Sequence, residues 1–91
     1  MATTVVNVET SPFDVYIGRW GEGYFGNPFK EGSRVQKLQR FAIYFYDRIV
    51  ADRHYKDAVE ALRGKRLGCH CKPLACHGDI IAAYLDRPET P

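Results

Sequence analysis

Apolar positions near the N-terminus fall into two short runs. Residues 5–8 are rich in β-branched side chains, and residues 14–18 form a second run, separated from the first by the turn-forming letters ETSP. β-branched runs bounded by turn residues are typical of strands. We therefore expect two strands in this part of the chain.

The apolar spacing becomes helical after residue 32. Ser33 opens the letters SRVQ, a capping-box pattern in which the Ser hydroxyl and the Gln36 side chain bind free amides of a first helical turn. Apolar residues then recur three and four positions apart, which predicts a helix to about Ala51 with one buried face. Its members are Leu38, Phe41, Ala42, Phe45 and Ile49. A shorter helix is expected over residues 55–63, with Gly64 placed to end it in a left-handed conformation.

The C-terminal third predicts one more strand and one more helix. The letters KRLGCHC, residues 65–71, alternate as a strand does; KPLA interrupts them, and CHGDIIAAYL, residues 76–85, has the pattern of a helix. Helices that separate strands favour a small α/β fold, which we expect to be a Rossmann-like sheet, at least partly parallel, with about three helices. We expect residues 1–91 to form a single domain, with an ordered core of about 4–86 and a frayed tail at 87–91.

Composition and charge limit the classes of partner. A chain of 91 residues with 45% apolar content has room for one folded domain. Its small core gives only a few kcal/mol of net stability, so a ligand, a metal or a second copy in a homo-oligomer would add a meaningful part. The net charge of +2, with no long basic run, argues against duplex nucleic acid but permits a small phosphorylated ligand. Without a signal-peptide pattern or an apolar stretch of about 18 residues, we expect a cytoplasmic protein with no membrane partner.

All three cysteines and two of the three histidines lie between Cys69 and His77. In a reducing compartment, an odd number of cysteines favours free thiols or thiolate ligands over a disulfide framework. One interpretation is a zinc site formed by Cys69, Cys71, Cys76 and His77. The spacing argues against it, because two sulfurs on one face of an extended strand lie roughly 6.5–7 Å apart unless the strand bends. Cys69, which alternates with Leu67, is expected in the core.

A second interpretation is an anion site at the start of the last helix. The letters CHGD come directly between the predicted strand and that helix. We expect the amides of Gly78, Asp79 and Ile80 to point outward, and Gly78 to let a phosphate approach the backbone. Asp79 is also an ordinary complement to the helix dipole at this position.

The same helix terminus would activate neighbouring side chains. The dipole would acidify Cys76 and favour its thiolate, which is what a nucleophile requires. His77 would then carry a proton, and Lys72 would hold a phosphate charge. Arg19 and Asn27 lie where the backbone bends near the carboxyl edge of the sheet, where open sheets bind ligands, so we count both as candidate ligand contacts.

Three ordered motifs carry a family resemblance. VYIGR at 15–19, GNPF at 26–29 and GKRLGCHCKPLACHGD at 64–79 resemble a family of small bacterial and phage proteins catalogued as domain of unknown function 4326. The similarity runs from about Val5 to Leu85, and His70 stands where an aromatic residue is common. Together with a looser similarity to other small Rossmann-like proteins, the resemblance implies binding or chemistry related to nucleotides.

These observations support one main hypothesis and two alternatives. The main hypothesis is a domain that binds a nucleotide or another phosphorylated metabolite without a metal or other cofactor, with or without transfer or hydrolysis by Cys76 and His77. Its ligand contacts would be Arg19, Asn27, Lys72, Gly78 and Asp79. One alternative is a phage accessory protein that sequesters a nucleotide without turnover. The other is an interaction module stabilised by zinc on Cys69, Cys71, Cys76 and His77.

Overall fold

The computed structural model describes residues 2–18, 24–72 and 74–87. In chain order, its elements are β1 (Thr4–Asn7), β2 (Val15–Tyr16), α1 (Arg34–Ala51), α2 (Arg53–Glu60), β3 (Arg66–Cys69) and α3 (His77–Leu85). Each lies where the hydrophobic pattern predicts it. The expected small α/β fold with a parallel sheet and three helices is therefore confirmed for the described part of the chain.

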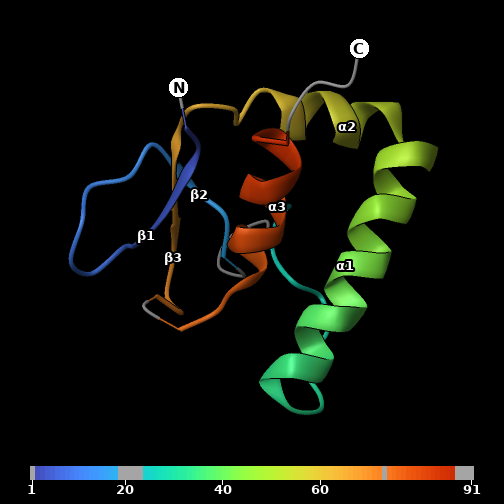
Figure 1. Cartoon of the computed structure of the whole chain (residues 1–91), viewed down its shortest axis with the longest axis horizontal. Coiled ribbons are helices and arrows are strands. Elements are labelled where there is room, and N and C mark those ends of the chain that lie inside the picture. Colours follow the sequence, from blue (N-terminus) through green and yellow to red (C-terminus); the bar gives the residue numbers. More distant parts are fainter. Residues whose placement is uncertain (1, 19–23, 73, 88–91) are drawn as a thin grey trace.

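The sheet has the strand order β1-β3-β2, and both outer strands pair with β3 in parallel. Leu67 in the central strand is opposite Val5 on one side and Val15 on the other. Because the chain reaches β3 last, it passes through α1 and α2 before it returns to the middle of the sheet (Figure 1). All three strands point the same way, so the residues after Tyr16 and Cys69 meet at one edge.

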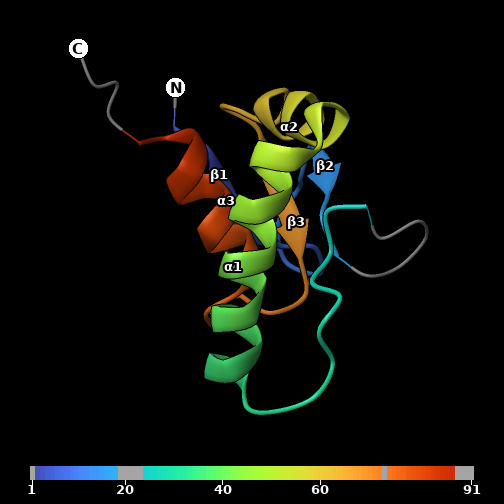
Figure 2. The same cartoon turned by 90° about the vertical axis from the view of Figure 1, so that its right-hand side faces the viewer.

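All three helices pack on the same side of the sheet, with α3 nearest the strands and α1 outside it (Figures 1 and 2). The buried face of α1 consists of Phe41, Phe45 and Ile49, as its spacing predicts. These side chains pack with Leu67 of β3 and Ile81 of α3 in one hydrophobic core. None of the helices described is long and apolar enough to cross a bilayer.

Local capping interactions define the helix ends. Ser33 Oγ accepts a hydrogen bond from the Gln36 amide at 3.1 Å, and Gln36 Oε1 accepts from the Ser33 amide at 2.9 Å. The predicted capping box is therefore confirmed. Gly64 has the expected left-handed conformation, with φ +78°, but α2 already ends at Glu60 with Ala61 as its C-cap, so Gly64 lies in the turn that leads to β3.

The C-terminal tail is described only in part. Arg87, at the start of the segment expected to fray, holds its guanidinium 4.0 Å from the centroid of the Tyr84 ring. Residues 88–91 of that expected tail lie outside the described residues.

Candidate functional site

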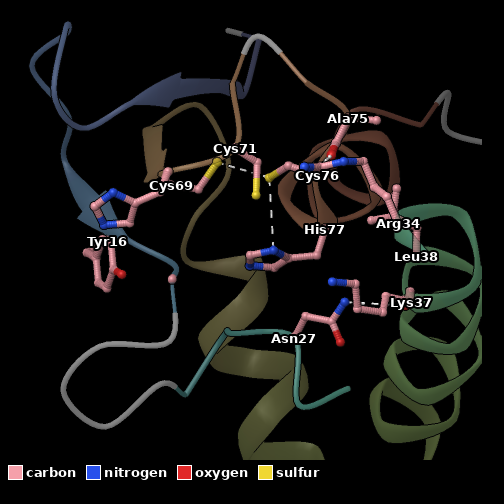
Figure 3. Close-up of a pocket in the computed structure, with 12 residues that line it drawn as sticks. Tyr16, Asn27, Arg34, Lys37, Leu38, Cys69, Cys71, Ala75, Cys76 and His77 are labelled. Atoms are coloured by element: carbon pink, nitrogen blue, oxygen red, sulfur yellow. Dashed lines mark hydrogen bonds between the residues drawn. The ribbon is translucent and has the colours of Figure 1, made fainter. Parts of the chain in front are cut away.

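A cavity of about 350 Å³ opens at the carboxyl ends of β2 and β3. The residues around it come from the ends of these strands, from the loop before α1, from the connection between β3 and α3, and from the N-terminal parts of α1 and α3 (Figure 3). This is the edge at which open α/β sheets hold ligands. The fold therefore brings two helix N-termini and two strand ends to one hollow.

One end of the cavity is cationic. Arg34 and Lys37, both near the start of α1, line it at the end opposite Tyr16 (Figure 3). Arg34 Nη1 donates to the carbonyl oxygen of Ala75 at 3.1 Å, which holds the side chain against the loop before α3. Within residues 2–18, 24–72 and 74–87, neither cation forms an ion pair, and no carboxylate lines the cavity.

Two sulfurs meet in the wall of the cavity. Cys69 Sγ at the end of β3 lies 3.0 Å from Cys76 Sγ, the N-cap of α3, and both side chains are buried. The hydrogen bond from Cys76 lowers the pKa of Cys69 to about 6, and the amides of Cys71 and Lys72 act in the same direction. That same hydrogen bond, followed by burial, raises the pKa of Cys76. The pair therefore favours the thiolate on Cys69, whereas the sequence analysis expects it on Cys76, so the nucleophilic role of Cys76 stays a prediction.

His77 connects the start of α3 to β2. Its Nε2 lies 2.7 Å from the carbonyl oxygen of Ile17, and its Nδ1 lies 3.9 Å from Cys76 Sγ. A carbonyl oxygen only accepts hydrogen bonds, so Nε2 carries the proton and Nδ1 is the basic nitrogen. The neutral ring thus presents an acceptor to Cys76, as in a cysteine–histidine pair, but it competes with the nearer Cys69 sulfur for the single Cys76 proton.

The amides at the start of α3 do not point freely outward as expected. The Gly78 amide donates to Cys76 Sγ at 3.1 Å, and the Asp79 amide donates to the Cys76 carbonyl oxygen at 3.0 Å. Gly78 is buried, and a Cβ there would lie 2.6 Å from Ile17 Cδ1. The small residue is needed for helix–sheet packing, and no phosphate can approach its Cα from that side.

Lys72 and Asp79 bind each other. Lys72 Nζ forms an ion pair with Asp79 Oδ1, and Asp79 Oδ2 accepts from the Cys76 amide at 3.1 Å, completing a capping box. Neither residue lines the cavity. The structure therefore uses Asp79 as a helix cap, and the charge predicted to hold a phosphate on Lys72 is neutralised by its neighbour.

Asn27, a predicted ligand contact, does line the cavity. It is buried; its Oδ1 accepts from the Phe29 amide at 2.9 Å, and its Nδ2 donates to the Lys37 carbonyl oxygen at 3.3 Å. Asn27 thus anchors the loop on α1 beside the two cations. Arg19, the remaining predicted contact, lies outside the described residues.

Of the residues predicted for the main hypothesis, the cavity unites Asn27, Cys76 and His77; Cys69 and Cys71, named for the zinc alternative, also line it. Sequence reasoning missed Arg34 and Lys37 altogether. One signal for them was available: the first turn of α1 contains basic and no acidic residues, although the helix dipole favours acidic ones there.

The zinc alternative finds no ready-made ligand set. Among the residues described, no group of three or more His, Cys, Asp or Glu side chains is arranged to hold a metal ion. Nε2 of His77 is engaged by Ile17, and the sulfurs of Cys69 and Cys76 contact each other directly. Zinc binding by these side chains and Cys71 stays a prediction.

The chain is similar to one known phage protein and matches one family model. No solved structure matches it. It is 46% identical over 86 residues to an "Uncharacterized 12.4 kDa protein in nrdA-td intergenic region" of Enterobacteria phage T4, in a match that covers 91% of this chain and 77% of the phage protein. A family model described as "Domain of unknown function (DUF4326)" matches residues 3–87. The resemblance inferred from the three motifs is thus confirmed, and the chain belongs to the DUF4326 family.

Proposed function

We propose that this protein binds a small nucleotide or a related phosphorylated metabolite in the cavity at the carboxyl ends of β2 and β3. The observation that carries the proposal is the pair Arg34 and Lys37, which border the cavity without a carboxylate partner among the described residues. A guanidinium binds phosphate through two parallel hydrogen bonds, and a lysine adds a point charge. The N-terminus of α1 contributes its dipole in the same place.

The opposite end of the cavity suits a nucleobase. Tyr16 lines it, and its ring is in edge contact with the ring of His70 at 5.8 Å between centroids. Aromatic side chains stack on any base, because every base has a π-face. A cavity with an aromatic end and a cationic end has the layout of a nucleotide, in which the base and the phosphate are separated by a sugar.

The size of the cavity restricts the ligand. Ligand pockets in proteins range from about 300 to 1,000 Å³, and a volume of about 350 Å³ lies near the lower limit. We therefore expect a mononucleotide or a compound of similar size, in preference to a dinucleotide.

Turnover is a separate prediction. The Nδ1 atom of His77 faces Cys76 Sγ at 3.9 Å, which favours a proton transfer between them, but the raised pKa of Cys76, caused by its hydrogen bond to Cys69 and by burial, opposes a free thiolate. Incubation of the protein with each bound nucleotide distinguishes the cases. Products that depend on both Cys76 and His77 would indicate a transferase or hydrolase. Recovery of the nucleotide intact would indicate a non-catalytic binder, in line with the phage accessory alternative.

Calorimetric titration tests the proposal directly. The reduced protein is titrated with the common ribonucleoside monophosphates, with the matching nucleosides and with inorganic phosphate. We expect a monophosphate to bind more tightly than its nucleoside, and Arg34→Ala with Lys37→Ala to weaken that binding at least about tenfold, since one charge-assisted hydrogen bond contributes about 1.5–3 kcal/mol.

Arg40→Ala is the matched control. Arg40 lies on the same helix, carries the same charge and is exposed, but it does not line the cavity. Its removal should leave affinity unchanged. Equal losses of affinity in the control and in the double variant would mean that only the net charge of the protein matters. Failure of every phosphorylated compound to bind at millimolar concentration would refute the proposal.

A further inference from the structure

The contact between Cys69 and Cys76 has a consequence beyond ligand binding. Their sulfurs lie 3.0 Å apart, about 1 Å longer than a disulfide bond. They are seven positions apart, at the end of β3 and the start of α3, and the fold of these two elements brings the sulfurs into contact. We propose that Cys69 and Cys76 form a peroxide-sensitive dithiol that closes reversibly to an intramolecular disulfide.

A small oxidant can reach the pair. Both side chains are almost fully buried, at 1% and 2% exposure, yet both line the cavity at the sheet edge. Hydrogen peroxide is small enough to enter a cavity of this volume, whereas a protein disulfide is not. An oxidising protein therefore cannot reach these two sulfurs, and we expect the oxidant to be a small hydroperoxide.

The surroundings favour the reactive form of one sulfur. Cys69 Sγ lies 3.0 Å from Cys76 Sγ, and the backbone amides of Cys71 and Lys72 contribute to lowering the pKa of Cys69. Backbone donors and nearby cations stabilise a thiolate, and the thiolate is the form that attacks a peroxide. The adjacent thiol of Cys76 is then in position to resolve the oxidised product.

The chemistry balances with hydrogen peroxide as the oxidant. The Cys69 thiolate attacks one peroxide oxygen, the O–O bond breaks, and the departing hydroxide takes up a proton to become water. The Cys76 sulfur then attacks the sulfenic sulfur of Cys69, the S–O bond breaks, and the second hydroxide leaves with the Cys76 proton as water. The two sulfurs lose two electrons and the peroxide gains them.

The test uses the full reduced chain and one equivalent of hydrogen peroxide. We expect the intact mass to fall by two hydrogen atoms, the monomer to persist, and a thiol reductant to restore the original mass. All three cysteines lie on one tryptic peptide, because Lys72 and Arg87 each precede a proline. The linkage is therefore assigned by blocking free thiols, reducing, labelling the released thiols with a second reagent and fragmenting that peptide.

Three variants make the assignment specific. Cys71→Ser should close the same bond at the same rate as the parent chain. Cys76→Ser should stop at a sulfenic acid on Cys69, which a sulfenic-acid trapping reagent captures, and Cys69→Ser should give neither product. The parent chain should also react about tenfold or more faster when folded than in concentrated urea, because only the fold holds the sulfurs together.

Other products would overturn the proposal. Oxygen added to Cys71 with no cross-link, a disulfide that includes Cys71, or equal rates in the folded and unfolded chain would each do so. The parent chain and Cys71→Ser decide the matter even where the other two variants fold poorly. Because the assay needs no nucleotide, its outcome is independent of what the cavity binds.

Discussion

The imidazole Nε2 of His77, the first residue of α3, lies 2.7 Å from the carbonyl oxygen of Ile17, the first residue after β2. This hydrogen bond connects the start of α3 to the end of the edge strand β2. The imidazole ring also packs edge-on against the Phe41 ring, with 5.2 Å between the ring centroids. Replacing His77 with Ala would leave the Ile17 carbonyl unpaired and open a cavity beside Phe41. We expect the free energy of unfolding to fall by about 3 kcal/mol.

Urea unfolding followed by circular dichroism measures this loss. His54→Ala, at an exposed position in α2, is the control and should change stability by less than about 0.5 kcal/mol. A His77→Ala chain as stable as the control would contradict a structural role for the ring.

The stability of the folded chain should depend on pH through the sulfur pair. The pKa of Cys69 is about 6, below its ordinary value of 9.0, chiefly because Cys76 donates a hydrogen bond to it. A group whose folded pKa is depressed stabilises the fold fully above its unfolded pKa and loses that contribution as the pH falls through its folded pKa. Stability should therefore rise between pH 6 and 9 in the presence of a reductant.

Above pH 9 the sign reverses, because the raised pKa of Cys76 keeps its proton in the folded chain while the unfolded chain releases it. Ultraviolet absorbance of the thiolate gives a direct readout. The absorbance should show one thiol per chain ionising near pH 6 in the parent chain and in Cys71→Ser. This step should be absent in Cys69→Ser. A titration that persists in Cys69→Ser would assign the thiolate elsewhere.

Substitution of Gly78 by Ala distinguishes packing from ligand contact. A Cβ at this position would lie 2.6 Å from Ile17 Cδ1 and 2.9 Å from Val5 Cγ1, so these side chains must shift or α3 must move away from the sheet. We expect a loss of about 1–3 kcal/mol in unfolding free energy, with nucleotide affinity kept in the fraction that folds. An unchanged stability combined with lost nucleotide binding would instead restore the phosphate-contact role that the sequence suggests.

Asp79 and Lys72 should differ in their effect on stability. Asp79→Ala removes the acceptor for the Cys76 amide at the start of α3 and should cost about 1–2 kcal/mol. Lys72→Ala removes only one partner of a partly exposed ion pair and should cost less than about 1 kcal/mol. Both residues lie outside the cavity lining, so calorimetry should show unchanged nucleotide affinity in each variant. Reduced nucleotide affinity in Lys72→Ala would indicate that this lysine contacts the ligand after all.

Tyr55 offers a substitution that should not destabilise. Its side chain is fully buried, and its hydroxyl has no hydrogen-bond partner within the described ranges. An unpaired buried hydroxyl is costly, so Tyr55→Phe should raise the unfolding free energy by up to about 1 kcal/mol. Tyr44→Phe is the matched comparison: its hydroxyl accepts from Arg48 Nη1 at 2.6 Å, and its loss should destabilise. Equal effects in the two variants would contradict this assignment.

Much of the fold follows from local sequence signals. The capping box at Ser33 and Gln36, the three-and-four spacing through Phe41 and Phe45, and the left-handed glycine after α2 all depend on residues within about one helical turn. Neighbours along the chain impose these preferences whatever the rest of the molecule does. The resemblance to the family also rests on short contiguous motifs, so the order of residues along the chain is enough to reveal it.

The candidate site depends on contacts between distant parts of the chain. Arg34 reaches the carbonyl oxygen of Ala75, 41 positions away, and the sequence around either residue gives no sign of the other. The packing of Gly78 could not be foreseen for the same reason, since the side chains that a Cβ there would meet belong to Ile17 and Val5.

The sequence alone thus determined which segments are strands and helices, to within a few residues at their ends, and the family to which the chain belongs. Only the tertiary structure decided which cations face the cavity, which two sulfurs are in contact, and which glycine is packed. The physical reason is one of range. Capping and periodicity act between residues a few positions apart, whereas charge, proton sharing and close packing depend on atoms that only the folded chain brings together.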